Sequence, residues 1–468
     1  MAMATTVLTI AAGVQVIVPD SIESLTTYVL KEQQDWFEEE IKVVRNMLQP
    51  GDVVIDIGAN HGVYALSMAK AVGATGRVVA FEPATQTRTL LEASARLNGF
   101  DQLIVDHRGV AEKSGVAFLS IDNQCELNQI ATSDSPVSAV ESIELTSLDD
   151  WLESSPPQRP IRLIKIDAEG QEMNILRGAE KLLEKHSPLI LYEIRHDLHL
   201  HFELVEAFAS HGYQSYRLLP GPQLLEPFAA NQPYDAFLLN LFCCKPQTAR
   251  ALQEQGRLVL PAEVGRSARQ SQTAIERVED AYGWQRTLKQ FPYAQHQWPL
   301  WLKNSEASAA AAIPLALHAL SMDPMQSPAD RALALHQSVQ QLHQLCISTE
   351  SPLYLSSLAR AARDAGERRL AVEALDSLIN ALPWLRDEDF QAPFLSPLAR
   401  FDMISTKDSL QKWLIAAAIE AHEELRHHSS FFSNSLFRDR LVYALDLGYE
   451  SEPLLRRLNL INRRFSAS

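Results

Sequence analysis

The hydrophobic positions in the first half of the chain form short continuous runs, separated by segments with helical spacing. Apolar runs of this length predict strands that are buried on both faces of a sheet. The runs occupy residues 53–57, 77–81, 103–105, 161–166 and 188–194. Apolar residues at steps of three and four predict helices at 63–70, 85–98, 173–184 and 200–211. This alternation predicts a doubly wound α/β sheet, whose ligands bind beyond the carboxyl ends of the strands.

Further segments of this half add to the sheet. Residues 7–19 are typical of one or two short strands. Residues 24–48 have helical periodicity, which predicts one helix that lies over the ligand-binding end of the sheet. Half-exposed strands are expected at 117–121 and 143–146. The polar segment between them, 122–137, is expected to form a loop over the active face.

The pattern changes after the last strands of the sheet. Strands expected at 213–218 and 235–243 have only a Pro/Gly-containing loop between them, which favours an antiparallel pair at the sheet edge. Residues 245–308 are irregularly helical, with three tryptophans as local anchors. These are Trp284, Trp298 and Trp301. From residue 309 onward glycine is scarce and alanine and leucine dominate, which predicts helices alone.

The first apolar run ends in an acid and a glycine-bearing turn. Asp56, Gly58, Asn60 and Gly62 form the pattern D-x-G-x-N-x-G, which lacks the G-x-G-x-x-G spacing of a pyrophosphate site. A nucleoside-like ligand with an amino acid tail, such as S-adenosylmethionine, suits this turn better, because glycine lets a ligand approach the backbone. Glu82 follows the second run at the offset where a carboxylate reaches ribose hydroxyls. The alternative is that these glycines serve packing alone.

Carboxylates also follow two later runs. Asp167, Glu169 and Glu193 stand at or just beyond strand ends, and a positioned carboxylate can take the proton of a hydroxyl acceptor. They are therefore the candidate catalytic residues, and Asp167 is also a candidate cofactor ligand. Histidines near the same rim are alternative bases: His61, His107 and His196. Two other interpretations stay open, in which Glu169 and Glu172 cap the following helix or Asp167 and Glu193 bind a metal, although no third ligand supports a metal site.

Composition narrows the class of protein. A chain of 468 residues is long enough for two or three domains, and 46% hydrophobic with 21% charged residues is typical of soluble globular proteins. The net charge of −16 disfavours nucleic acid and anionic membranes as partners. The four cysteines have no framework spacing, which favours a reduced, cytoplasmic protein. We expect neither a membrane span nor a signal peptide.

Three stretches give the chain a family resemblance. Residues 51–62 contain the glycine turn, residues 165–172 read KIDAEGQE with LRGA at 176–179, and residues 188–193 read PLILYE. On these stretches the chain resembles the FkbM family of S-adenosylmethionine-dependent methyltransferases, over about residues 14–244. The resemblance implies a class I methyltransferase fold, Rossmann-like and seven-stranded, with a sheet that is parallel apart from its last strand. It also implies O-methylation, often of sugar or polyketide hydroxyls.

The second half resembles a known repeat more weakly. Residues 355–383 have the offsets of one tetratricopeptide repeat, with leucine and alanine in place of the usual aromatic residues. We therefore expect a methyltransferase domain at 1–245, a helical linker at 246–308 and an all-α domain at 309–468. The expected function is O-methylation of a glycan or related metabolite, with the helical domain binding the substrate or a partner protein. Alternatives are a scaffold protein with a degenerate methyltransferase domain and, less favoured, a nucleotide-dependent dehydrogenase.

Overall fold

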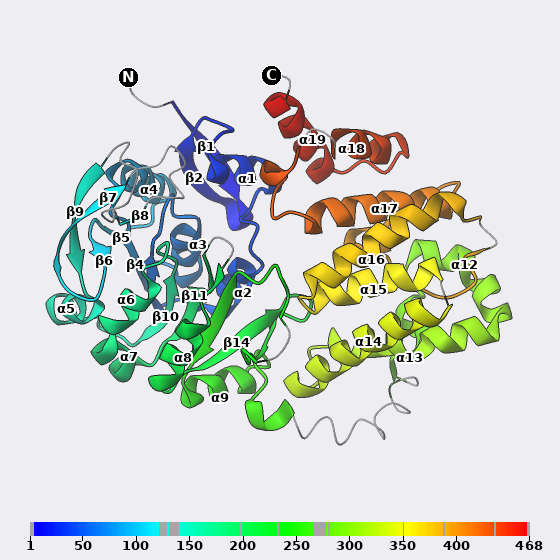
Figure 1. The fold of residues 1–468 in the computed structure, drawn as a ribbon, viewed down its shortest axis with the longest axis horizontal. Helices are drawn as coiled ribbons and strands as arrows, with labels where there is room; N and C mark the ends of the chain where they lie inside the picture. Colours follow the sequence, from blue (N-terminus) through cyan, green and yellow to red (C-terminus); the bar gives the residue numbers. More distant parts are fainter. Residues whose placement is uncertain are drawn as a thin grey trace. The chain divides into compact units, whose positions relative to one another are not determined.

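The computed structural model of the chain contains two compact units (Figure 1). The structure describes residues 4–120, 129–130, 140–196, 199–231, 234–264, 278, 281–349, 351–386, 389–434 and 437–465. The first unit comprises Met1–Arg217, Phe228–Gln232 and Leu238–Ala251. The second comprises Leu218–Pro227, Pro233–Phe237 and Leu252–Ser468. Across the described residues, no helix has the length and apolar character that crossing a membrane requires.

Within the first unit the main sheet has the strand order β14-β16-β11-β10-β3-β4-β5. These strands are β3 (Val53–Ile57), β4 (Arg77–Phe81), β5 (Leu103–Asp106), β10 (Ile161–Ile166), β11 (Leu189–Glu193), β14 (Gln214–Leu219) and β16 (Asn240–Cys244). The strands from β5 to β11 pair in parallel, and β16 runs antiparallel to both β11 and β14. The predicted class I methyltransferase sheet, parallel apart from its last strand, is therefore confirmed.

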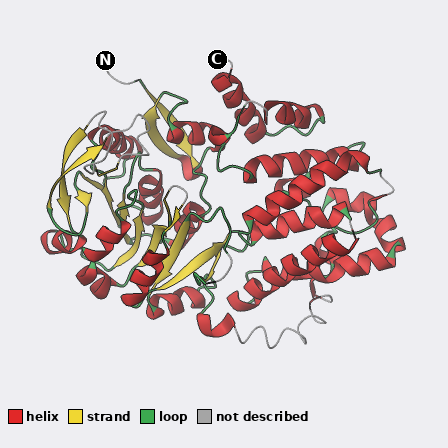
Figure 2. Cartoon of the chain, in the orientation of Figure 1, coloured by secondary structure: helices red, strands yellow, loops and turns green. Residues whose placement is uncertain are grey.

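Helices cover both faces of this sheet (Figure 2). One face carries α2 (Glu40–Met47), α3 (Val63–Val72) and α4 (Thr85–Asn98). The other packs a hydrophobic core against α5 (Leu148–Ser154), α6 (Glu172–Arg177), α7 (Glu180–His186) and α8 (Phe202–Ser210). The helix α4 has its predicted bounds and ends at Gly99, whose φ of 66° is left-handed as expected. The helix α9 (Pro246–Glu254) begins in this unit, whose last residue is Ala251.

Short strands outside the main sheet form three small sheets. An N-terminal hairpin of β1 (Thr5–Ile10) and β2 (Val14–Pro19) surrounds η1 (Ala11–Gly13), and β12 (Arg195–His196) pairs with β13 (His199–Leu200). The inserted sheet contains β6 (Gly109–Val110), β7 (Gly115–Ser120), β8 (Gln129–Ile130) and β9 (Val140–Thr146). The strands predicted at 117–121 and 143–146 are β7 and β9, which pair antiparallel. The predicted loop at 122–137 lies outside the described residues apart from β8.

Two expected helices are each interrupted in the structure. Residues 24–48 form α1 (Leu25–Gln33) and α2, not one helix, because Gln34 takes a left-handed φ of 56° and Asp35 is held by Arg45. The helix expected at 173–184 is likewise divided into α6 and α7. It breaks at Gly178, where the chain passes so close to another segment that a Cβ would lie 2.4 Å from the carbonyl oxygen of Ala111.

The second unit is mainly helical, as predicted. Its helices are α11 (Trp284–Thr287), α12 (Pro292–Lys303), α13 (Ser305–Ser321), α14 (Pro328–Thr349), α15 (Pro352–Asp364), α16 (Arg368–Ala381), α17 (Leu410–Leu425), α18 (Phe437–Asp446) and α19 (Glu452–Phe465). It also contains β15 (Leu224–Pro227), η3 (Leu382–Trp384), η5 (Ala399–Met403) and η6 (Ser430–Phe432). Trp284 packs with Trp298 and Trp301 at ring distances of 4.9 and 5.8 Å, which confirms these anchors. The helical pair α15–α16 occupies the segment that resembles a tetratricopeptide repeat, and that resemblance stays a prediction.

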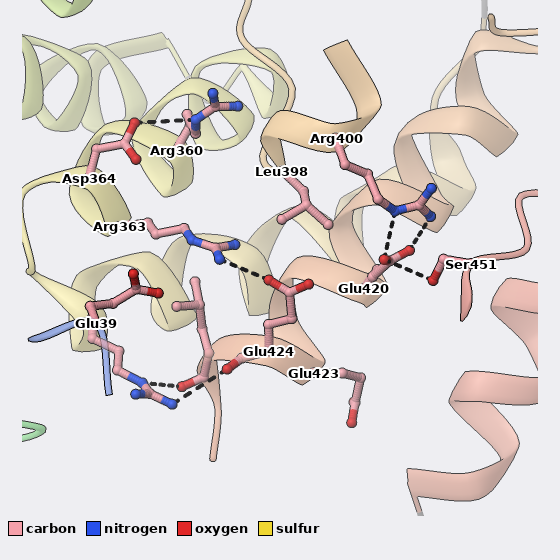
Figure 3. A network of polar contacts seen from close by, with 12 residues as sticks. Glu39, Arg360, Arg363, Asp364, Leu398, Arg400, Glu420, Glu423, Glu424 and Ser451 are labelled. Atoms are coloured by element: carbon pink, nitrogen blue, oxygen red, sulfur yellow. Dashed lines mark hydrogen bonds and ion pairs between the residues drawn. The ribbon is translucent and has the colours of Figure 1, made fainter. Parts of the chain in front are cut away.

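Partly buried ion pairs join the helices of this unit (Figure 3). Two guanidinium nitrogens of Arg400, Nε and Nη2, donate hydrogen bonds to the carboxylate of Glu420. The same carboxylate accepts a hydrogen bond of 3.0 Å from the Ser451 hydroxyl. Arg363 Nη2 donates to Glu424 at 2.8 Å. Such pairs fix how helices are oriented more than they stabilise the fold, because burial removes the hydration of both charges. We assign this network a structural role.

Candidate active site

A cavity of about 290 Å³ lies in the first unit where β3, β4, β10 and β11 end. Seven of the residues singled out in the sequence line it: Gly58, Asn60, His61, Glu82, Asp167, Glu169 and Glu193. Among the described residues, Asp56, Gly62, His107 and Glu172 do not line it. The sheet therefore brings most of the predicted site residues to one place, although they come from four strand ends.

The glycine turn after β3 is shaped by packing within the chain. Gly58 and Gly62 have left-handed φ values of 76° and 82°. A Cβ on Gly58 would lie 1.8 Å from the carbonyl oxygen of Asp167, and one on Gly62 would lie 2.1 Å from Leu91 Cδ1. That these glycines let a ligand approach the backbone stays a prediction, and the structure adds a packing reason for them. Their lack of a side chain lets the β3 turn close onto the β10 turn and onto α4.

Substituting Gly58 with alanine is expected to destabilise the first unit by roughly 3 kcal/mol, because strain in φ adds to a clash with backbone. Gly99→Ala is the matched control, since Gly99 has a φ of 66° but nothing within 4 Å of a Cβ. Its expected cost is about 1 kcal/mol, from strain alone. Thermal unfolding of both variants measures the difference. Equal shifts in midpoint would contradict the importance of the contact with Asp167.

Glu82 links the end of β4 to the glycine turn. Its Oε2 accepts a hydrogen bond of 2.8 Å from the backbone N–H of Asn60, and its Oε1 accepts one of 2.9 Å from the N–H of Ala84. The side chain is 7% exposed, and this burial raises the pKa of Glu82 to about 7. Glu82 thus orders the turn and at the same time presents a carboxylate to the cavity.

Asp56 and Lys165 form a buried pair of charged residues at the cavity, which Lys165 lines and Asp56 does not. They are direct neighbours across β3 and β10, and both are almost fully buried. Neither oxygen of Asp56 meets the geometry of a hydrogen bond with a described residue, and burial raises the pKa of Asp56 to about 6. Lys165 Nζ donates to Asp167 Oδ2 at 2.7 Å and lies 4.8 Å from the ring centre of Tyr64. Burial alone would lower the pKa of Lys165, but the carboxylates of Asp167, Asp56 and Glu38 raise it.

The break between α1 and α2 supplies residues that the sequence did not predict for the site. Trp36, Phe37 and Glu38 line the cavity, together with Tyr64 from α3. The Tyr64 hydroxyl donates a hydrogen bond of 2.6 Å to Glu38 Oε2, and burial raises the pKa of Glu38. Residues 24–48 contain neither glycine nor proline, so no local signal marked this break.

Glu193, which lines the cavity, and Glu172, which does not, have separate roles. Glu193 ends β11, and its burial, reinforced by the charges of Asp167, Glu169, Glu172 and Glu38, raises its pKa to about 11. Glu193 therefore carries a proton at neutral pH. Glu172 Oε1 accepts from the N–H groups of Ala168 (3.0 Å) and Gly170 (3.3 Å), which supports the alternative in which Glu172 holds the turn before α6.

The three candidate histidines are not brought together. His61 is buried and lines the cavity. His107 is largely exposed and pairs with Glu144 at 3.5 Å. His196 belongs to β12, and its side chain is outside the described part of the structure. Among the described residues, no group of three or more His, Cys, Asp or Glu side chains is arranged to hold a metal ion.

The charges around the cavity are mostly negative. The described lining holds five carboxylates, Glu38, Glu82, Asp167, Glu169 and Glu193, and one cation that is not a histidine, Lys165. Lys165 already pairs with Asp167. Burying carboxylates is costly unless a positive charge or hydrogen-bond donors compensate them. The cavity is therefore suited to a cationic ligand and unsuited to a phosphate.

Comparison with known proteins shows a match between this part of the chain and a protein family. Residues 56–215 match the model of the methyltransferase FkbM domain. "Methyltransferase 1" of Beauveria bassiana (strain ARSEF 2860) is 23% identical over 155 residues, a match that covers 29% of this chain and 61% of that relative. The chain thus spans less than two thirds of that relative's length.

Two solved structures are similar to part of the chain. Methyltransferase FkbM from Methylobacillus flagellatus KT has 17% identity and a TM-score of 0.29, over 42% of this chain and 45% of that one. An S-adenosylmethionine-dependent O-methyltransferase from Thermotoga maritima has 15% identity and a TM-score of 0.27, over 51% and 77%. From the family match, the first unit contains a methyltransferase domain of the FkbM family at residues 56–215.

Proposed function

We propose that this cavity binds S-adenosylmethionine and that the protein methylates a hydroxyl of a glycan or related metabolite. The observation that carries the proposal is the excess of carboxylates in the cavity, because the cofactor has a net positive charge and no phosphate. When bound, the cofactor would supply a methyl group attached to a positively charged sulfonium. Transfer of this methyl group to the acceptor oxygen would convert the sulfonium to a neutral thioether.

The residues present fit such a cofactor. A carboxylate has about four acceptor positions, so Glu82 keeps capacity for ribose hydroxyls after binding the amides of Asn60 and Ala84. Gly58 and Asn60 present the turn to the cavity, and Asp167 offers a carboxylate to the ammonium of the amino acid tail. Asp56 and Gly62, which lie behind the wall, are proposed to position this turn and Lys165.

The acceptor must lose its proton as the new C–O bond forms. Asp167 is our candidate base. Its Oδ2 binds Lys165 and has a second acceptor position for the ammonium of the cofactor tail, which leaves Oδ1 for the proton. Glu193 already holds a proton in the ligand-free protein, so we assign it and Glu169 to acceptor binding. We further propose that the domains are 1–245, 246–308 and 309–468, and that the last binds the substrate or a partner protein, since helical repeats form extended binding surfaces.

Calorimetric titration with S-adenosylhomocysteine and, separately, with NAD tests the proposal. We expect micromolar or tighter binding of S-adenosylhomocysteine and none of NAD. Incubation with deuterated-methyl S-adenosylmethionine and a set of oligosaccharides, followed by mass spectrometry, then detects methylation of a hydroxyl. Binding of neither ligand would favour a scaffold with a degenerate methyltransferase domain, and binding of NAD alone would favour a dehydrogenase.

Binding of S-adenosylhomocysteine is expected to tighten about tenfold between pH 6 and pH 8. Glu82 accepts hydroxyl donors best as a carboxylate, and with a pKa of about 7 it is mostly protonated at pH 6 and mostly ionised at pH 8. Because this pKa lies above the ordinary value of 4.5, the ligand-free protein also loses stability as pH rises from about 4.5 to about 7, the range in which Glu82 is ionised in the unfolded chain and still protonated in the folded one. Calorimetry at both pH values measures the effect. A Glu82→Gln variant should show no such dependence, and an unchanged dependence in that variant would exclude Glu82 as its source.

A further inference from the structure

The segment between α1 and α2 is held rigidly against the cavity. The Asp35 carboxylate accepts two hydrogen bonds from the Arg45 guanidinium, at 2.6 and 2.7 Å, and Arg45 also donates to Ser67 Oγ in α3 at 2.9 Å. Asp35 Oδ1 accepts from the N–H of Trp36 as well, at 2.9 Å. A bidentate pair of this kind fixes geometry in addition to adding energy. Trp36 and the two residues after it are thus part of the wall in a defined position.

These residues give the cavity an aromatic surface beside acids. The rings of Trp36 and Phe37 have centroids 4.7 Å apart, and Glu38 is tied to Tyr64. Aromatic faces attract cations as well as the apolar faces of sugar rings. Carboxylates bind ammonium groups through charge-assisted hydrogen bonds.

The carboxylates of the cavity lie at two sides of it. Glu193 ends β11 and Glu82 follows β4, and β10 and β3 separate these two strands in the sheet. Burial and the charges of Asp167, Glu169 and Glu38 keep Glu193 protonated in the ligand-free protein. Glu82 therefore marks the end that we assign to the cofactor, and Glu193 with Glu38 marks a second end, where an added cation would favour ionisation of Glu193.

One cofactor cation does not neutralise this lining. Besides the protonated Glu193 the lining holds four acids, and Lys165 with the net charge of the cofactor offsets two of them, so the second end can still take a cation. Resting on the proposed function, we propose that the acceptor is an amine-bearing, polyhydroxylated molecule such as an amino sugar with a free amino group. Its ammonium group would bind between Glu38, Glu193 and the aromatic pair Trp36–Phe37. An ammonium group there would let Glu193 release its proton and form an ion pair, which an uncharged sugar of the same shape could not do.

Three disaccharides with the same β-1,4 bond test this inference: those of glucosamine, N-acetylglucosamine and glucose. Calorimetry first establishes binding of S-adenosylhomocysteine, and the loaded protein is then titrated with each sugar. We expect the glucosamine disaccharide to bind at least tenfold more tightly than the other two. Because a chain with a charge of −16 attracts any cation, variants must show that the preference arises in the cavity.

Glu38→Gln removes a carboxylate, and Glu193→Gln removes the group that would ionise when an ammonium binds, both with little change of shape. Each is expected to reduce the preference to threefold or less. Glu180→Gln, at an exposed position on α7, should leave it unchanged. Equal binding of the three sugars, a preference for an uncharged one, or no binding of any sugar by the loaded protein would overturn the amino sugar inference while leaving the cofactor site intact. Failure to bind S-adenosylhomocysteine would instead overturn the proposed function itself.

Discussion

Replacing Lys165 with methionine is expected to lower the melting temperature of the first unit by roughly 10 °C at pH 7. Lys165 is 5% exposed and lies among the carboxylates of Asp56, Asp167 and Glu38. Removing one member of a buried ion pair costs about 3–5 kcal/mol, because the partner charge stays buried without compensation. In a unit of this size each kcal/mol corresponds to about 2–4 °C. Differential scanning calorimetry measures the shift.

The same loss should depend on pH in a defined direction. Lowering the pH to 5 protonates Asp56, whose pKa is about 6 with Lys165 present and higher without it, so the deficit of Lys165→Met should shrink. The double variant Asp56→Asn/Lys165→Met should recover part of the stability at pH 7, because one buried charge is gone. Lys181→Met is the control, since Lys181 pairs with Glu153 at the surface and such pairs contribute little. A deficit of equal size in the control, or one independent of pH, would contradict the charge argument.

Glu82→Ala is expected to weaken binding of S-adenosylhomocysteine at least 100-fold while the chain stays folded. The substitution removes the acceptor of two backbone amides and the proposed partner of the ribose. Hydrogen bonds to a charged group contribute about 1.5–3 kcal/mol each, and about 1.4 kcal/mol corresponds to a factor of ten in affinity. Calorimetry at pH 8, where Glu82 is ionised, gives the affinity, and circular dichroism verifies the fold.

Two further variants make this result specific. Glu82→Gln keeps one carbonyl oxygen and should retain intermediate affinity. Glu180→Ala removes an exposed acid of the same type and should bind as the unaltered protein does. If Glu82→Ala folds normally and binds within threefold of the unaltered protein, Glu82 does not hold the cofactor.

The local sequence pattern was sufficient to predict the strands, and to predict those helices whose ends are marked by nearby residues. The five apolar runs form parallel strands of the sheet. The helix α4 ends at Gly99 because glycine adopts the left-handed conformation that ends a helix. The strand ends in turn placed Glu82, Asp167 and Glu193 around one cavity, since parallel strands bring their carboxyl ends to the same edge.

The wall formed by Trp36, Phe37 and Glu38 was decided by tertiary contacts. Nothing within residues 24–48 breaks a helix locally, and the break follows from Asp35 binding Arg45 and Glu38 binding Tyr64, which is 26 positions away. The need for glycine at position 58 likewise comes from a tertiary contact, because the backbone of Asp167, far along the chain, leaves no room for a Cβ there.

By itself, then, the sequence determined where strands and helices occur along the chain and which acids follow the strands. It could do so because hydrophobic periodicity and turn composition depend on only a few neighbouring residues. Only the tertiary structure decided which acids hold protons and which residues complete the cavity. Burial and neighbouring charges set the pKa of Glu193 and of Asp56. These depend on which segments, distant in sequence, pack against one another.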